Sequence, residues 1–348
     1  MGGQVGFSAK EQTTLVIFRL GAIGDLVNTI PLVKFIRWTR PGDHLIYVVN
    51  KKYASLLERV PEIDLLVQLE EDDLKPIALP QTANYLSQQI NCEGWQIEFV
   101  CLQSLNQLIP LASLMGVTRL HEYRNRNYWL SKLTAWQRFI RSFCNVAPLE
   151  ELKLKMAQQI PLLKASNTED IRHKLSSRKI DPEAKLIALI PGVGQNYPHK
   201  AWPKEHWVEL FDMLQQANIQ SVFVGGEQDK ELISDIIAKS KNPELTHLNL
   251  AGLFLLDELV DLFSIVSCAI GADTGPVHIA AAMGKLNICL FGPTSRFKHA
   301  PIQGTVLHES CSLLCKLQKN RSCSKAASSC MYKITAERVF RQIMSEGF

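Results

Sequence analysis

The chain has 348 residues, of which 46% are hydrophobic and 21% charged, and its formal net charge is +4. This length and balance are typical of a globular protein with room for two domains, and so small a net charge does not by itself indicate nucleic-acid binding. No run of about 18 uncharged apolar residues occurs, which argues against a transmembrane helix, and residues 1–13 lack the apolar core of a signal peptide. We therefore expect a cytoplasmic protein with no nucleic-acid partner.

The first strongly patterned stretch predicts a strand, a glycine turn and a helix. Residues 14–20 are apolar and rich in β-branched side chains, Gly21 and Gly24 follow them, and residues 26–38 carry apolar side chains at helical spacing. This succession opens many nucleotide-binding α/β domains, although the GxGxxG fingerprint of dinucleotide binding is missing. Three further strands, each separated by helical or turn sequence, indicate a parallel sheet. They are predicted at residues 45–49, 64–67 and 97–102.

Asp25 is predicted at the N-terminal end of this first helix, where the helix dipole stabilises an ionised carboxylate. Two roles fit it. Aspartate is a favoured helix cap. An ionised carboxylate at a loop exit could also act as a general base and accept the proton of an attacking hydroxyl. The local residues leave both roles open.

Residues 119–141 combine basic and aromatic side chains. The basic residues are Arg119, Arg124, Arg126, Lys132, Arg138 and Arg141, and the aromatic ones are Tyr123, Tyr128, Trp129, Trp136 and Phe139. Such a mixture suits an acidic glycolipid or a membrane surface, and it also suits single-stranded nucleic acid. A solvated helical face with buried aromatic rings explains most of these positions more simply, so we expect only one or two arginines to contact an acceptor.

A polar and charged stretch at residues 164–182 precedes a new apolar strand at 186–190, and the domain boundary is predicted there. We expect an N-terminal domain of residues 1–170 and a C-terminal domain of residues 182–348, both built on the α/β pattern.

Two side chains of the second domain are placed to contact a nucleotide. Lys200 lies beside a glycine-containing loop at 191–194 and before a helix predicted at 205–216, so it could reach a phosphate as a point charge or remain solvated. Glu227 follows a strand predicted at 220–224, where a carboxylate can hold ribose hydroxyls or cap a helix.

A second strand–turn–helix corner is predicted further on, with a buried strand at 264–270 and a helix of small residues at 277–283. Another apolar strand, at 287–291, follows it. Proline suits the first turn of such a helix, and the free backbone N–H groups at its start form a site for phosphate at the positive end of the helix dipole. An ordinary structural corner is the alternative. The residues whose grouping favours a function are Asp273, Thr274, Gly275, Pro276 and His278.

Four of the nine cysteines cluster near the end of the chain, at Cys311, Cys315, Cys323 and Cys330. They could hold a structural zinc ion, form disulfides if oxidised, or remain thiols. Their spacing is not the paired CxxC pattern that indicates zinc strongly. Residues 334–348 are predicted to form a terminal amphipathic helix.

Several separate motifs combine into a family resemblance. They are RLGAIGDL at 19–26 with TIP at 29–31, KAWP at 200–203, GGE at 225–227, DTGPVHIAA at 273–281, FGPT at 291–294, and Cys330-Met331 followed by Ile334. In this order and spacing the chain resembles glycosyltransferase family 9, the heptosyltransferases that act in the core region of bacterial lipopolysaccharide, in the Gram-negative cell envelope. The match is spread over most of the chain.

The resemblance implies a GT-B architecture, in which two Rossmann-like domains with parallel sheets face each other across a cleft. The first domain would bind mainly the acceptor and the second the nucleotide sugar, and the final helix often returns to the first domain. It implies inverting transfer of heptose from ADP-L-glycero-D-manno-heptose to an inner-core sugar of lipopolysaccharide, with peripheral contact to the inner membrane surface. No metal or other cofactor is expected, because a lysine and a helix dipole can stabilise the leaving diphosphate.

The resemblance also implies roles for individual residues. Asp25 matches the general base, with Gly24 beside it in the substrate-binding turn, and Lys200 matches the phosphate-contacting lysine. The remaining matches are Asp273 as a contact of the donor sugar, Thr274, Gly275 and Pro276 as the diphosphate-binding helix start, Glu227 as the ribose contact, and His278 as a neighbour of the donor.

Two departures bear on the donor. The loop PGVGQN at 191–196 is not the hydroxyl-rich loop of some heptosyltransferases, and Leu255-Leu256 stands where many members have threonine or serine before a leucine. Alternatives are therefore a family member that uses another nucleotide sugar or surface-glycan acceptor, or a non-catalytic nucleotide-binding protein. A dehydrogenase is disfavoured by the missing GxGxxG motif, and a nucleic-acid protein built on residues 119–141 would show steeply salt-dependent binding.

Overall fold

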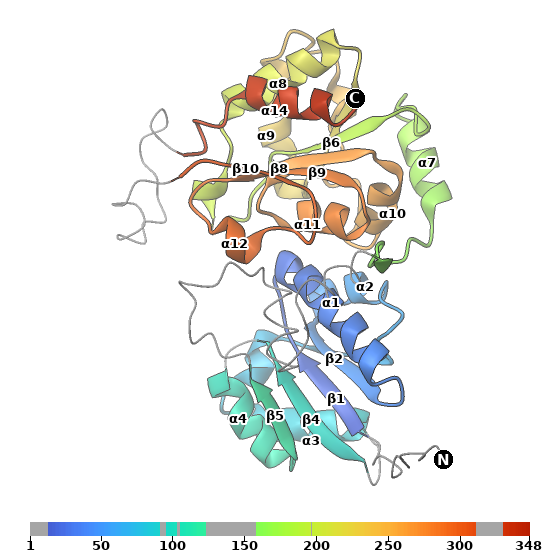
Figure 1. Ribbon diagram of the computed structural model, residues 1–348, viewed down its shortest axis with the longest axis vertical. Coiled ribbons are helices and arrows are strands. Elements are labelled where there is room, and N and C mark those ends of the chain that lie inside the picture. Colours follow the sequence, from blue (N-terminus) through green and yellow to red (C-terminus); the bar gives the residue numbers. More distant parts are fainter. Residues whose placement is uncertain (1–12, 91–94, 103–104, 123–157, 196, 311–329) are drawn as a thin grey trace, which may run out of the picture. The chain divides into compact units, whose positions relative to one another are not determined.

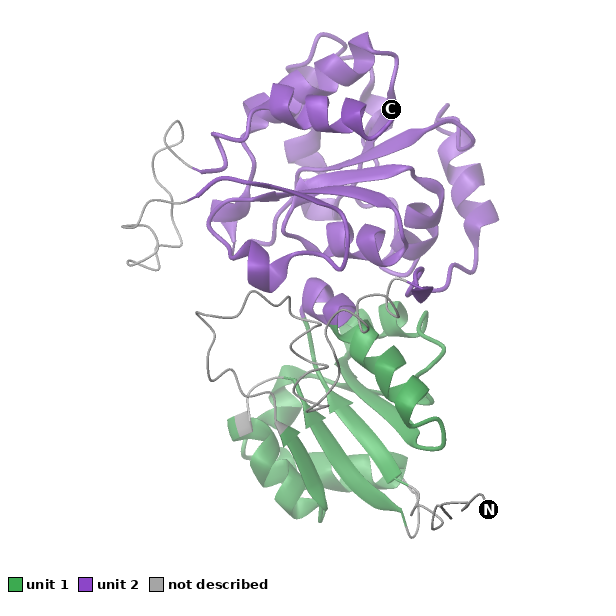
Figure 2. Ribbon diagram, viewed as in Figure 1, with its two compact units in different colours: residues 1–21, 29–129, 136–152 green, residues 22–28, 130–135, 153–348 purple. Residues whose placement is uncertain are grey.

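The computed structural model describes residues 13–90, 95–102, 105–122, 158–195, 197–310 and 330–348. These residues form two compact units, which Figure 2 shows in different colours. Of the described residues, 13–21 and 29–122 belong to the first unit, and 22–28 and 158–348 belong to the second. The basic and aromatic residues from 123 to 141 and three of the clustered cysteines, at 311, 315 and 323, lie outside the described residues.

The first unit is built on a parallel sheet of five strands in the order β3-β2-β1-β4-β5. The strands are β1 (Thr13–Phe18), β2 (His44–Asn50), β3 (Leu65–Leu69), β4 (Gln96–Cys101) and β5 (Arg119–Glu122). The helices are α1 (Ile23–Thr39), α2 (Ala54–Leu57), α3 (Leu79–Ile90) and α4 (Leu105–Leu114). Every residue of β1 is buried, as expected for a central parallel strand that is covered on both faces.

Alternate side chains of β1 enter different layers of this unit. Phe18 packs with Leu86 of α3 and Leu108 of α4 in one apolar cluster. The opposite face of the sheet meets α1, where the hydroxyl groups of Thr29 and Tyr47 lie 2.7 Å apart. The two-residue repeat of a strand thus distributes one apolar run over both faces.

The second unit has its own parallel sheet of five strands, in the order β10-β9-β8-β6-β7. The strands are β6 (Leu186–Ile190), β7 (Gln220–Phe223), β8 (Cys268–Ala272), β9 (Leu286–Phe291) and β10 (Thr305–His308). The helices are α7 (Thr168–Ser176), α8 (Lys204–Gln216), α9 (Lys230–Ala238), α10 (Glu258–Ile265), α11 (Gly275–Ala282), α12 (Arg296–His299) and α14 (Ala336–Ser345). Helices α8, α9 and α14 lie on one face of this sheet, and α10 and α11 lie on the other (Figure 1).

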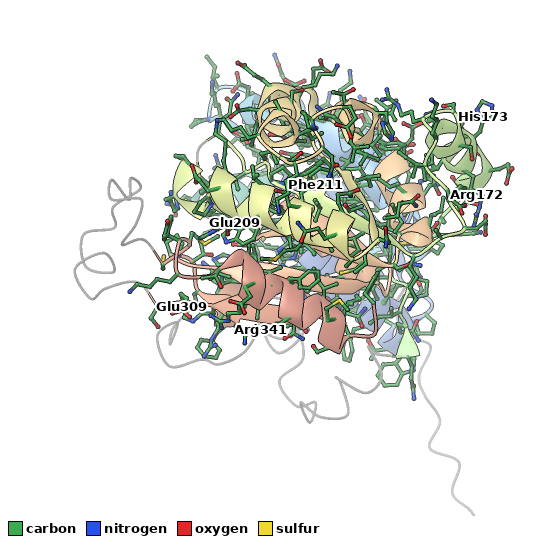
Figure 3. The ribbon with its side chains drawn as sticks, turned by 90° about the horizontal axis from the view of Figure 1, so that it is seen from above. Arg172, His173, Glu209, Phe211, Glu309 and Arg341 are labelled. Atoms are coloured by element: carbon green, nitrogen blue, oxygen red, sulfur yellow. The ribbon has the colours of Figure 1, made fainter. Side chains whose placement is uncertain are left out.

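The end of the chain is tied to the start of α8. Helix α14 runs alongside α8, as Figure 3 shows from above. Just before α14, the carbonyl of Ile334 accepts a 2.7 Å hydrogen bond from the buried indole Nε1 of Trp202, and the carbonyl of Tyr332 lies 2.8 Å from Nε2 of His206. The KAWP motif therefore anchors the C-terminal segment as well as the loop that carries Lys200.

The predicted α/β class with two parallel sheets is confirmed, and most predicted strands agree with the observed ones to within two residues. The strand predicted at 264–270 was placed too early, because Ser264 and Ile265 complete α10 and β8 begins only at Cys268. The helix predicted at 205–216 is α8, which begins at Lys204 with Pro203 as its N-cap residue. Among the described residues, no helix is both long enough and apolar enough to cross a bilayer.

Candidate active site

The strand order of the second unit predicts where a ligand binds. The chain runs from β6 to β7 on one side and later returns through β8 on the other side of β6. The loops after β6 and β8 therefore diverge from neighbouring strand ends, and such a switch point is the usual ligand crevice of an open parallel sheet. Lys200 follows β6, and Asp273 follows β8 directly.

The switch point brings Lys200 and Asp273 together across 73 residues of sequence. The ammonium Nζ of Lys200 donates a 2.8 Å hydrogen bond to the carboxylate Oδ2 of Asp273, and it lies 3.2 Å from the backbone oxygen of the same residue. The ring of Tyr197 contributes a cation–π contact, with its centroid 4.8 Å from Nζ. Lys200 is therefore held in place and is not a solvated loop lysine.

His278 holds the other oxygen of the same carboxylate. Its Nε2 lies 3.2 Å from Oδ1 of Asp273, and its side chain is only 3% exposed. His278 is a buried residue of α11, five residues after Asp273, so the helix positions its ring against the Asp273 carboxylate. Nδ1 of His278 is buried and has no hydrogen-bond partner among the described residues.

The pKa values of Asp273 and His299 differ from those of the same side chains in water. Burial alone would raise the pKa of the Asp273 carboxyl, but the hydrogen bond from His278 and the charge of Lys200 outweigh burial and hold that pKa well below its usual range. Burial lowers the pKa of nearby His299, in α12, to about 4, so that imidazole is neutral at pH 7. Asp273 is therefore an ionised carboxylate beside the Lys200 ammonium, with the neutral imidazole of His299 nearby.

The start of α11 has the helix N-terminus that the sequence predicted. Thr274 is its N-cap residue, the Thr274 side chain makes no capping hydrogen bond, and Pro276 lies in the first turn. A side chain at Gly271, at the end of β8, would place its Cβ 2.8 Å from Val277 and 3.0 Å from the backbone oxygen of Ile190. The absence of a side chain therefore lets α11 approach the β6–β8 strand ends closely.

Glu227 lies apart from this group, after β7. Its side chain is 71% exposed and pairs with Lys230 at 2.8 Å. Gly252 has a φ of +74° and lies directly against the Glu227 carboxylate, so a larger residue would not fit there. The Glu227 carboxylate is therefore exposed beside the backbone of Gly252, where it can bind a polar ligand.

Sequence reasoning missed Asp229 and His299. Asp229 accepts a 2.9 Å hydrogen bond from the N–H of Gly226, and burial raises the pKa of its carboxyl. A Cβ on Gly192 or Gly225 would lie within 3 Å of the Asp229 side chain, so both glycine loops close around this carboxylate. The glycines were visible in the sequence, but the group that they accommodate was not.

Gly24 and Asp25 lie in the first turn of α1, which begins at Ile23 after the loop that follows β1. Asp25 is partly buried. Residues 22–28 are grouped with the second unit, the unit that holds Lys200 and Asp273, although the rest of α1 belongs to the first. The C-terminal cysteine cluster is represented among the described residues by Cys330 alone, which is buried.

Two α/β units, each with a five-stranded parallel sheet, match the GT-B architecture of solved heptosyltransferases. Solved structures share this fold. A glycosyl transferase family 9 protein from Veillonella parvula superposes with a TM-score of 0.76 at 19% identity, over 98% of both chains. An ADP-heptose lps heptosyltransferase II of Escherichia coli superposes with a TM-score of 0.69 at 19% identity, over 96% of this chain and 98% of that one.

The chain belongs to glycosyltransferase family 9 (heptosyltransferase), whose family model matches residues 110–328. Lipooligosaccharide heptosyltransferase 2 of Haemophilus influenzae is 25% identical over 286 residues, which cover 78% of this chain and 81% of that protein. Lipopolysaccharide heptosyltransferase 2 of Escherichia coli is 32% identical over 117 residues, a third of each chain. The resemblance stated from the motifs is thereby confirmed, and the chain is an enzyme of this family.

Proposed function

We propose that this enzyme transfers heptose from ADP-L-glycero-D-manno-heptose to an inner-core sugar of lipopolysaccharide, with inversion at the anomeric carbon. The observation that carries the proposal is the buried group of Lys200, Asp273 and His278 beside the uncapped start of α11. Relatives named as a lipooligosaccharide and a lipopolysaccharide heptosyltransferase, matched over most of their length, support the choice of acceptor. A solved structure named as an ADP-heptose heptosyltransferase supports the choice of donor.

In the proposed reaction the acceptor hydroxyl oxygen attacks the anomeric carbon as the bond from that carbon to the diphosphate breaks. The hydroxyl proton passes to Asp25, which becomes protonated, and ADP leaves with the bonding electron pair. Asp25 suits this role because a carboxylate in the first turn of a helix is stabilised in its ionised form.

The leaving diphosphate gains negative charge, and the second unit offers positive groups for it. Lys200 would contact the diphosphate as a point charge, while the backbone N–H groups of Thr274 and Gly275 and the dipole of α11 would hold its oxygens. Removal of one such donor typically costs about 3 kcal/mol of transition-state stabilisation. Pro276 keeps this helix start rigid, since its ring fixes the backbone φ angle.

The remaining residues would recognise the rest of the donor. Asp273, held by His278, would accept a hydrogen bond from a hydroxyl of the heptose. The exposed carboxylate of Glu227 would accept hydrogen bonds from the ribose hydroxyls. Gly24, beside Asp25 in the first turn of α1, would contact the substrate. We also propose peripheral contact with the inner membrane surface, because the acceptor is a glycolipid and residues 119–141 are basic and aromatic.

The test is ADP release by the purified enzyme given ADP-heptose and a heptose-deficient lipopolysaccharide acceptor. We expect acceptor-dependent release that falls by roughly a hundredfold to ten-thousandfold in Asp25→Asn, the range for loss of a general base. Affinity for ADP should stay within about twofold, because the base contacts the acceptor and not the nucleotide. Glu205→Gln is the matched control, since Glu205 is an exposed acid in the first turn of α8.

The outcomes separate the alternatives. Nucleotide release from another sugar nucleotide, but not from ADP-heptose, would show that the enzyme is a glycosyltransferase with a different donor. Binding of ADP without release from any sugar nucleotide would indicate a non-catalytic nucleotide-binding protein. Loss of ADP affinity in Asp25→Asn would contradict the role assigned to that carboxylate.

A further inference from the structure

The positive charge of the Lys200 ammonium group is paired with a carboxylate inside the protein. A lysine ammonium carries three N–H donors. One is used at 2.8 Å on Oδ2 of Asp273, and the backbone oxygen of Asp273 lies 3.2 Å from the same nitrogen. The two side chains are only 16% and 7% exposed, so water screens this pair weakly. The ammonium group that is proposed to contact the diphosphate therefore already has the Asp273 carboxylate beside it.

Both oxygens of the Asp273 carboxylate already have a partner. Oδ2 accepts a hydrogen bond from Lys200, Oδ1 lies 3.2 Å from Nε2 of His278, and the side chain is only 7% exposed, so a sugar hydroxyl has to share one of these oxygens or replace its partner. A diphosphate at the start of α11 would lie close to this carboxylate, and like charges at such distances repel each other. This repulsion favours a change in one of the existing contacts when a charged donor enters.

We propose that Asp273 is an exchangeable counterion: the donor diphosphate displaces it from Lys200, and the freed Oδ2 then accepts a hydroxyl of the donor sugar. This inference rests on the proposed function, since it takes a nucleotide diphosphate sugar as the ligand of this site. His278 stays on Oδ1 throughout and keeps the carboxylate aimed while its other oxygen changes partner.

The exchange discriminates substrate from product. An intact donor replaces the broken Lys200–Asp273 contact with a bond from its sugar to Oδ2. ADP alone breaks the same contact, offers no sugar hydroxyl, and leaves the buried carboxylate short of a partner, which is unfavourable. After transfer, Lys200 can return to Asp273 as ADP leaves. The carboxylate therefore weakens product binding while it strengthens donor binding.

A different use of the same contacts makes the opposite prediction. If the third N–H of Lys200 contacts the phosphate while the lysine stays on Asp273, the carboxylate merely positions the lysine. Removal of the carboxylate charge would then loosen the lysine and weaken ADP binding. The sign of the change in ADP affinity therefore separates exchange from simple positioning.

The experiment is calorimetric titration of ADP into the full-length wild type and Asp273→Asn. Asparagine keeps the shape and the acceptor oxygen that faces His278 but removes the charge that holds Lys200. We expect the ADP dissociation constant to fall by roughly threefold to tenfold, the effect that a single partly buried charge contact produces. ADP release from ADP-heptose in the presence of acceptor should fall in the same variant, because the sugar loses its contact.

The chain offers a matched control pair on its surface. Lys204 donates to Asp235 at 2.6 Å, in the same unit but on α8 and α9, with the lysine 47% and the aspartate 33% exposed. Asp235→Asn should leave ADP affinity within about twofold of the wild type, since exposed pairs contribute little. In a Lys200→Gln background, Asp273→Asn should improve ADP binding less than it does alone, because no ammonium group remains to be released.

Unchanged or weaker ADP binding in Asp273→Asn would overturn the exchange and leave the proposed function intact, provided that the wild type binds ADP and transfers heptose. Failure of the wild type to bind ADP would overturn the proposed donor and the exchange with it. If asparagine prevents folding, as judged by thermal unfolding, Asp273→Ala is the second variant. It removes the same charge, and the exchange predicts the same direction of change.

Discussion

Lys200 and Lys204 carry the same side chain four residues apart, and only their surroundings separate their roles. Lys204 pairs with Asp235 at the surface, where solvent and salt weaken the contact. Lys200 is 16% exposed and lies between a buried carboxylate and the ring of Tyr197. A charge in that position acts on a bound phosphate with less screening, so the two lysines should respond differently to the same substitution.

We predict that Lys200→Gln weakens ADP binding by roughly tenfold to a hundredfold, the cost of a lost hydrogen bond to a charged group. Glutamine keeps most of the side-chain length and can still approach Asp273, so the change is mainly one of charge. Calorimetric titration of ADP measures it, with Lys204→Gln as the control for the loss of one nearby positive charge. Equal effects of the two substitutions would show that Lys200 acts only through the general field of the protein.

Single-residue predictions from the sequence succeeded where the chemistry is local. Pro276 in the first turn of α11 and Asp25 in the first turn of α1 follow from helix-start preferences, which depend on a few neighbouring residues. The Lys200–Asp273 pair spans 73 residues and depends on the strand order β8-β6, which no local pattern encodes. His299 was missed for the same reason, because it comes close only after β9 pairs with β8.

At the level of elements, burial explains which strands were found and which were missed, although the fully buried β8 was placed too early because apolar residues of α10 precede it. Strand β6 was predicted with its exact bounds, because all five of its residues are buried and apolar. Strands β5 and β10 were missed because they bury little: β10 has one buried residue, and Arg119, Leu120 and His121 of β5 are not buried. Strand β7, an edge strand of the same length, buries three of its four residues and was predicted. A strand that buries few residues carries less of the apolar signal on which such prediction depends.

The contact between β8 and α11 yields a prediction about an element. At Gly271, an added Cβ would lie 2.8 Å from Val277 and 3.0 Å from the Ile190 oxygen, which is backbone and cannot move aside easily. We expect Gly271→Ala to lower the unfolding free energy by about 1–3 kcal/mol, as overpacking does in well-packed interiors. The same displacement of α11 should weaken ADP binding, because the start of that helix is the proposed diphosphate site.

Thermal unfolding and ADP titration check this prediction together. Gly42→Ala is the matched control, since an added Cβ there meets no atom within 4 Å. It should change the unfolding free energy by less than about 0.5 kcal/mol. A Gly271→Ala enzyme with wild-type stability would show that α11 can move away without cost, and the close approach would then have no structural importance.

At the scale of the whole molecule, the buried site links stability to pH. Burial lowers the pKa of His299 from an ordinary 6.5 to about 4. Between these two values the unfolded chain binds more protons than the folded one, so the unfolding free energy falls as the pH drops from 6.5 toward 4. A single group contributes at most about 1.4 kcal/mol per pH unit in this window. Asp273, whose pKa is lowered, contributes stability that is present at higher pH and is lost only below its unfolded value of about 3.9.

We therefore predict that His299→Gln flattens the decline of stability between pH 6.5 and pH 4.5, since glutamine has no proton to gain. Urea denaturation at half-unit pH steps measures the slope for the variant and for the wild type under the same ionic strength. His173→Gln is the control, because His173 is exposed on α7, as Figure 3 shows, and its removal leaves the buried site intact. The wild type and the control should lose stability in parallel while His299→Gln loses less. If all three decline with the same slope, His299 takes up its proton without cost in the folded protein, and other groups govern the acid sensitivity of this unit.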